Sequence, residues 1–164
     1  MSAMTMLEMA GKLAAAEVAI HINARSALKR VAVKVEATAK AELGTYQDAV
    51  GPFPAWAELA ESTKDERSRL GYTPNDPLLR SGELLDSIKH DVTDLVATIG
   101  STSEIAEYLE FGTSKMPPRP FIGPAAETNI EAIKRELGGA VVSGMIGGRQ
   151  IHSSLGYNNV VTSP

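Results

Sequence analysis

The chain has 164 residues, of which 43% are hydrophobic and 22% are charged, and it contains no cysteine. A chain of this length fits one domain, or two at most, and its composition excludes wholesale disorder and collagen-like repeats. The lack of cysteine excludes disulfides and thiolate metal sites, and a net charge of -4 argues against a surface built to hold nucleic-acid phosphates.

Neither a membrane-spanning segment nor an export signal is expected. The longest apolar windows, residues 14–20 and 140–146, are much shorter than the ~20 residues that a spanning helix needs. Glu8 and Lys12 interrupt the apolar pattern near the N-terminus, whereas a signal peptide has a basic region followed by an unbroken apolar block. We therefore expect synthesis in the cytoplasm and no membrane contact.

Residues 5–43 predict one long helix, because good helix formers dominate and no proline occurs. Apolar residues recur every three or four positions and so form one packing face: Met6, Met9, Leu13, Ala16, Ile20, Ala24, Leu28, Val31, Val35 and Ala39. The predicted helix is several times longer than average. Two explanations remain open: the helix breaks near residues 21–23, or part of it packs against another chain.

Residues 44–54 are rich in glycine and proline and predict a loop. A second helix is expected over 55–70, with Trp56 and Leu59 on its apolar side. Its charged run at 64–67 (KDER) is typical of a solvated face. Residues 72–77 predict another turn-rich linker.

Alternating apolar residues predict a β-hairpin over 86–100, with Thr93 and Asp94 at its turn. A lone hairpin is marginally stable in water, so we expect helices to cover it. Helical spacing returns at 104–111, and Gly112 suits a left-handed C-terminal cap.

The segment 116–124 (MPPRPFIGP) contains four prolines and predicts a stiff, extended arm that presents Phe121. Pro124 is well placed as the first residue of a final helix, which Gly138 and Gly139 should weaken or end. The glycine- and serine-rich tail after that helix is expected to be mobile.

Together these elements predict an α+β fold in which a long N-terminal helix and a C-terminal helix pack on a small antiparallel sheet. We expect a single domain over 1–147, with a helical insertion at about 45–77, and a tail over 148–164.

The sequence offers little support for catalysis. His21, His90 and His152 are scattered over different predicted elements, and neither nucleotide-binding nor hydrolase motifs occur. Glu104, Glu107 and Glu110 form a strip on a short helix, which is more simply a solvated face than a metal site. We therefore predict a protein that is not an enzyme and has no catalytic, cofactor-binding or metal-binding residues.

The proline-rich arm instead suggests a contact surface, because a pre-extended segment loses less conformational entropy on binding. In this interpretation Arg119 pairs with Glu107 or Glu110 of the same or an adjacent chain. Replacing Arg119 and Phe121 by alanine should then spare folding and impair assembly. The alternative is a loop folded over its own subunit, with Phe121 filling the core. The predicted subunit interface comprises Glu107, Glu110, Phe111, Gly112, Met116, Pro117, Pro118, Arg119, Pro120 and Phe121.

Four segments in order resemble the tail-completion proteins of long-tailed bacteriophages, which join head to tail. They are residues 79–88 (LRSGELLDSI), 97–100 (ATIG), 106–113 (AEYLEFGT) and 116–125 (MPPRPFIGPA). The series lies within roughly 77–137. The 45–77 insertion is absent from simpler members but resembles a stretch of Mu-like morphogenesis proteins, and the segment after Gly144 has no recognised counterpart.

The resemblance implies a structural virion protein of the head–tail interface, made in the bacterial cytoplasm and located at the neck or tail end. It implies a homo-oligomeric ring, a hexamer or alternatively a dodecamer, through which DNA passes without sequence-specific binding. The neighbours would be head-completion, tail-terminator or tail-tube proteins. Two other functions stay open: an adaptor that recruits proteins through the proline-rich arm, and a small metal-dependent hydrolase that uses the glutamate strip.

Overall fold

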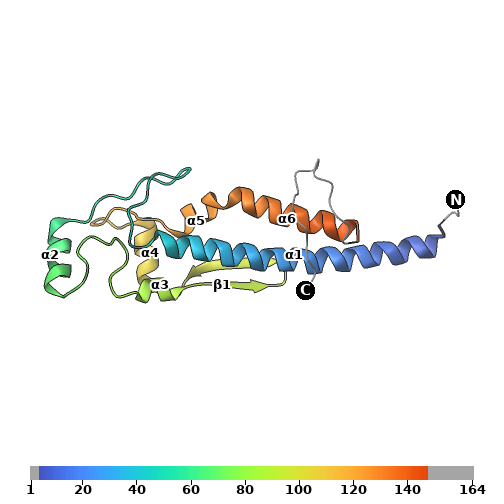
Figure 1. Cartoon of the computed structure of the whole chain (residues 1–164), viewed down its shortest axis with the longest axis horizontal. Helices are drawn as coiled ribbons and strands as arrows, with labels where there is room; N and C mark the ends of the chain where they lie inside the picture. Colours follow the sequence, from blue (N-terminus) through green and yellow to red (C-terminus); the bar gives the residue numbers. More distant parts are fainter. Residues whose placement is uncertain (1–3, 148–164) are drawn as a thin grey trace. The chain divides into compact units, whose positions relative to one another are not determined.

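The computed structural model describes residues 4–147. The fold class is α+β, as predicted. The elements in chain order are α1 (Met6–Glu42), α2 (Glu61–Arg69), α3 (Glu83–Ser87), β1 (Ile88–Thr93), β2 (Val96–Ser101), α4 (Glu104–Phe111), α5 (Ile122–Thr128) and α6 (Ile130–Met145) (Figure 1). The predicted tail at 148–164 lies outside the described residues.

The described residues form two compact units. The first contains residues 4–31, 92–97 and 131–147, and the second contains residues 32–91 and 98–130. Helix α1 and the hairpin each contribute to both units.

Helix α1 is continuous over 37 residues, so the break considered near residues 21–23 does not occur. A capping box begins the helix. The Glu8 backbone N–H donates to the Thr5 hydroxyl at 3.2 Å, and the Thr5 N–H donates to the Glu8 carboxylate at 2.8 Å. These two hydrogen bonds between Thr5 and Glu8 satisfy backbone donors that would otherwise be unpaired at the start of the helix.

In the first unit, α6 packs antiparallel on α1 (Figure 1). The Arg30 guanidinium donates to the Glu136 carboxylate at 2.9 Å, and Gly144 lies directly against Ile20. Gly138 and Gly139 were expected to weaken or end this helix, and they do not end it, since α6 continues to Met145. Its buried small residues, which include Gly139 and Gly144, allow the two backbones to approach closely, and this packing offsets the low helix propensity of glycine.

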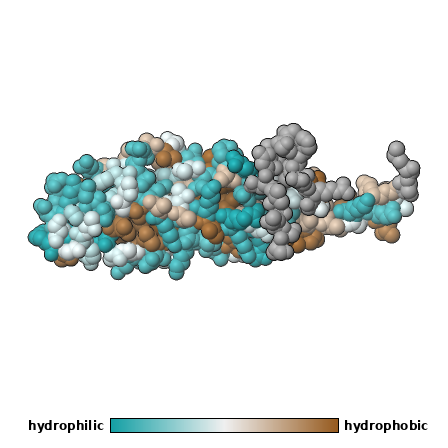
Figure 2. Space-filling model, viewed as in Figure 1, coloured by the Kyte–Doolittle hydropathy of each residue, from teal (hydrophilic) through white to brown (hydrophobic). Residues whose placement is uncertain are grey.

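The N-terminal part of α1 is exposed within the same unit. Figure 1 shows its first turns extending past the end of α6, and Figure 2 shows hydrophobic residues at its surface. Met6 and Leu13 are 84% and 62% exposed, although residues on the same helical face further along, such as Val31 and Val35, are buried.

The second unit has a contiguous core in which Phe121 and Ile88 are fully buried. The C-terminal half of α1 covers them with one helical face. The other buried apolar residues of this unit are Ala32, Val35, Ala39, Leu43, Trp56, Leu59, Pro77, Leu78, Ala106, Pro120, Pro124 and Ala125.

Strands β1 and β2 form a two-stranded antiparallel hairpin, close to the prediction. Its turn is Asp94 and Leu95 rather than Thr93 and Asp94, and Asp94 has a positive φ of 55°. Asn and Asp tolerate this conformation better than most residues, which explains the shift by one position. In the second unit, the His90 side chain of β1 pairs with Glu36 of α1.

The helix expected over 55–70 is shorter than predicted, because α2 begins only at Glu61. Trp56 lies in the extended segment before it, where its indole N–H donates to the Pro120 carbonyl at 2.9 Å. The charged run was predicted to be solvated, but Arg67 is buried, and its guanidinium donates to the carbonyls of Asp76 and Leu79. Tertiary contacts therefore override local helix propensity here.

Candidate subunit-interaction site

The proline-rich segment leaves α4 through a backbone conformation that only glycine adopts readily. Gly112 has φ 73° and ψ 177°, so the positive φ expected for a cap is present but the helical ψ is not. A Cβ at this position would lie 2.8 Å from the Pro118 nitrogen. The chain then turns tightly, with Thr113 and Met116 bridged by backbone hydrogen bonds.

The structure corrects the prediction that this segment presents Phe121 away from its own subunit. Phe121 has no exposed surface, and the adjacent Pro120 is buried as well. The alternative, in which the segment folds over its own chain and Phe121 fills the core, describes the observed placement. Burying a large aromatic ring is strongly favourable, and a loop beside an incomplete core provides the space for it.

Arg119 is also buried within its own chain, with 4% of its surface exposed. Its Nη2 donates to the carbonyls of Ala57 at 2.9 Å and Glu58 at 3.0 Å, and its Nε donates to the same Ala57 carbonyl. The predicted pairing with Glu107 or Glu110 of the same chain therefore does not occur. Burial lowers the pKa of the Arg119 guanidinium, which nevertheless stays protonated because its ordinary value is so high.

Within its own chain Glu110 binds backbone N–H groups and not Arg119. Its carboxylate accepts hydrogen bonds from the backbone N–H groups of Phe121, Ile122 and Gly123, at 2.9, 3.2 and 3.0 Å. These donors belong to the start of α5, where backbone N–H groups lack helical partners. Glu110 thus fastens the proline-rich segment to α4.

A second carboxyl group lies near Glu110. Glu42, in the last turn of α1, is 8% exposed, and its Oε2 has no hydrogen-bond partner among the described residues. Its burial, together with the negative charge of Glu110, raises the pKa of Glu42 to about 7. No motif or spacing in the sequence singles out this residue.

The remaining predicted interface residues are accessible. Phe111 is 77% exposed, Glu107, Pro117 and Pro118 are exposed, and Gly112 and Met116 are half-buried. Their proposed role in a subunit interface stays a prediction.

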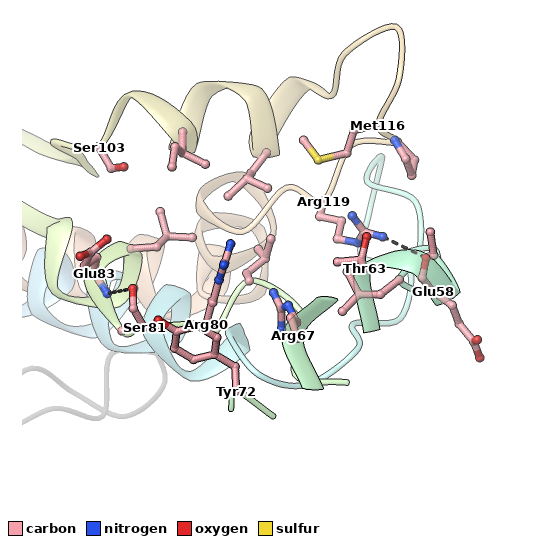
Figure 3. A pocket seen from close by; sticks show the side chains of 18 of the residues that line it. Glu58, Thr63, Arg67, Tyr72, Arg80, Ser81, Glu83, Ser103, Met116 and Arg119 are labelled. Carbon is pink, nitrogen blue, oxygen red and sulfur yellow. Dashed lines mark hydrogen bonds between the residues drawn. The ribbon is translucent and has the colours of Figure 1, made fainter. Parts of the chain in front are cut away.

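A hollow of about 740 Å³ lies in the second unit (Figure 3). Side chains of the proline-rich segment, of α4, and of residues 58–67 and 78–84 surround it. Three of the four segments that resemble tail-completion proteins therefore meet around one cavity. The lining residues are Glu58, Leu59, Ala60, Thr63, Arg67, Tyr72, Leu78, Arg80, Ser81, Gly82, Glu83, Leu84, Ser103, Ile105, Leu109, Lys115, Met116, Pro117 and Arg119.

Figure 3 shows that Arg67, Arg80 and Arg119 reach this hollow from three different segments. The Arg80 guanidinium lies 5.1 Å from the centre of the Tyr72 ring, within range of a cation–π interaction. It also lies 3.5 Å from the Glu66 carboxylate. Sequence reasoning missed this cluster, because the three arginines belong to different segments of the chain.

The glutamate strip does not gather into a metal site. Glu104 and Glu107 are exposed, whereas Glu110 faces the start of α5. Within residues 4–147, no three His, Asp or Glu side chains are arranged to hold a metal ion. The helices of this described region are also too short or too polar to cross a membrane.

Comparison with known proteins supports a phage origin. The chain is 36% identical over 86 residues to Mu-like prophage FluMu G protein 1 of Haemophilus influenzae. The match covers 50% of this chain and 59% of that relative, so the chain spans well under two thirds of the relative's length. No protein-family model and no solved structure matches the chain.

Proposed function

We propose that this protein is a structural, non-enzymatic component of a phage virion that acts at the head–tail interface as a homo-oligomeric ring. One observation supports the proposal most strongly. Three of the segments that resemble tail-completion proteins, 79–88, 106–113 and 116–125, each contribute residues to the lining of one hollow. These segments are distant in sequence, so their meeting at one accessible place is consistent with a shared contact surface. Similarity to a Mu-like prophage protein supports the phage assignment.

The exposed apolar residues also favour an assembly. The first turns of α1 leave large hydrophobic side chains in water, and so do Tyr108 and Phe111 of α4, which is typical of surfaces that a partner covers. A closed ring requires that one surface of each copy meets a different surface of the next. Head-completion, tail-terminator or tail-tube proteins would lie above and below the ring, and its net negative charge would let DNA pass without adhering.

Two measurements test the proposal together. Light scattering and electron microscopy of the full-length chain, alone and mixed with its virion neighbours, should reveal rings. A phage that lacks the gene should accumulate separate heads and tails, and resupplying the protein should restore joining. A chain that stays monomeric in every mixture and is absent from purified virions would contradict the proposal.

The adaptor function remains a second proposal, because Pro117 and Pro118 are exposed on a stiff backbone. An adaptor predicts binding to one soluble partner without self-assembly. Crosslinking in infected cells distinguishes the two, since a ring yields crosslinks between identical copies.

A further inference from the structure

Helix α4 has three distinct sides. Ala106 and Glu110 face the core of the second unit, and Ile105 and Leu109 line the hollow. The third side contains Glu104, Glu107, Tyr108 and Phe111. We call this third side the outer face of α4.

The outer face is an unusual surface for a monomer. Phe111 and Tyr108 are 77% and 56% exposed, and they neighbour one another on the helix because they are three residues apart. Two carboxylates, Glu104 and Glu107, flank them. Aromatic residues are enriched at protein interfaces, where they provide much of the binding energy.

The hollow has an excess of basic residues. Its lining contains four basic side chains and two carboxylates, and its apolar wall includes Ile105 and Leu109; the charged lining residues are Arg67, Arg80, Lys115, Arg119, Glu58 and Glu83. Arg67 and Arg119 are more than nine-tenths buried, and their guanidinium groups donate to backbone carbonyls, which leave their positive charge unneutralised. A hollow with buried, uncompensated arginines favours an anionic occupant.

We propose that the hollow of one copy receives the outer face of α4 from a second copy of this chain. Phe111 of the incoming helix would pack on the apolar wall, and Glu107 would pair with Arg80. The two surfaces differ and lie on different sides of α4, so each copy can offer one surface while it uses the other. This heterologous contact is the kind that builds a ring, and the inference rests on the proposed function.

Arg80 suits the role of an exchangeable partner. Its side chain is 47% exposed, and its present partner Glu66 is 53% exposed at a separation of 3.5 Å. Ion pairs this open contribute little to stability, so Arg80 can exchange Glu66 for an incoming carboxylate. Tyr72 holds the guanidinium in place from one side.

Charge reversal with complementation tests the contact. Native mass spectrometry should show the wild-type ring, and Glu107→Arg and Arg80→Glu should each abolish it. In an equimolar mixture of the two variants, alternating copies restore an opposite-charge pair at every contact, so the ring should return. A hexamer or dodecamer accommodates such alternation because its copy number is even.

Glu131→Arg provides a matched control, because Glu131 is an exposed carboxylate of α6 and the charge changes equally. This variant should retain the ring, and circular dichroism should show unchanged helix content in all variants. If either single variant still forms the ring, or if the mixture of variants does not assemble, the proposed contact is wrong. Neither result contradicts the proposal that the wild-type chain forms a ring. A wild-type chain that never forms rings would overturn the proposed function instead.

Discussion

The Glu110 Oε2 atom lies 2.9 Å from the backbone nitrogen of Phe121, and this hydrogen bond joins the end of α4 to the start of α5. The same carboxylate also accepts from the next two backbone N–H groups. One acidic side chain therefore satisfies three donors and holds Phe121 at the entrance to the core. The proline-rich segment between these residues is consequently anchored at both ends.

Replacing Glu110 by alanine should lower the free energy of unfolding by about 2–4 kcal/mol, because several partly buried N–H groups lose a charged acceptor. Urea unfolding monitored by tryptophan fluorescence would measure this change, since Trp56 also contacts the segment. For the isolated, unassembled chain, Glu107→Ala is the matched control, because Glu107 lies one turn earlier and is exposed. Equal stability of the two variants would refute the anchoring role.

The Phe121→Ala change should cost about 3–5 kcal/mol, as expected for a large side chain removed from a packed core. The sequence alone predicted that replacing Phe121 would spare folding, but the burial of Phe121 predicts a loss of stability instead. Phe111→Ala should alter stability by less than about 0.5 kcal/mol, because that ring is exposed. Thermal or urea unfolding of both variants as isolated chains would decide the matter.

Gly144→Ala should weaken the packing of α6 on α1. A Cβ at Gly144 would lie 2.6 Å from the Ile20 Cα, so the helices must move apart, at a cost of about 1–3 kcal/mol. Gly11→Ala is the opposite case. Nothing lies within 4 Å of a Cβ there, and alanine should raise helix stability by about 0.5–1 kcal/mol.

Hydrogen exchange of α6 amides would report this difference locally. Faster exchange in Gly144→Ala and unchanged exchange in Gly11→Ala are expected. If both changes affect α6 equally, close packing at Ile20 is not what requires glycine.

The Glu42→Gln change should make stability less dependent on pH. The folded-state pKa of Glu42 is raised from 4.5 to about 7, so the folded chain binds a proton more tightly than the unfolded chain. The wild type therefore loses stability as the pH rises from about 4.5 to about 7, and above that range the whole penalty applies.

Glutamine carries no charge, so Glu42→Gln should be more stable than the wild type by about 1–3 kcal/mol at pH 8 and nearly equal to it at pH 4. Urea titrations at several pH values would measure this. A variant that is less stable at every pH would show that the Glu42 carboxylate is favourably bound.

Patterns of short range were predicted well. The uninterrupted run of helix formers predicted α1, the alternation of apolar residues predicted the hairpin to within one turn position, and α4 was predicted with its observed bounds. The brief helix α3 was missed, because five residues carry too little periodicity to be recognised.

Long-range partners were predicted poorly. Arg119 was assigned to nearby carboxylates, yet it binds carbonyls of Ala57 and Glu58, some sixty positions away in the chain. The charged run around Arg67 predicts a solvated face, yet Arg67 is buried and donates to the Asp76 carbonyl. In each case the nearest opposite charge in the sequence was not the partner.

Propensity, periodicity and proline geometry act over a few residues, so the sequence alone was enough to predict α1, the hairpin, α4 and the stiff proline-rich segment. Long-range packing, in contrast, directs the stiff segment inward, fastens it through Glu110 and brings three arginines to one hollow. Those outcomes depend on which apolar side chains complete a core and which donors lose water, and both are set by residues distant in the chain.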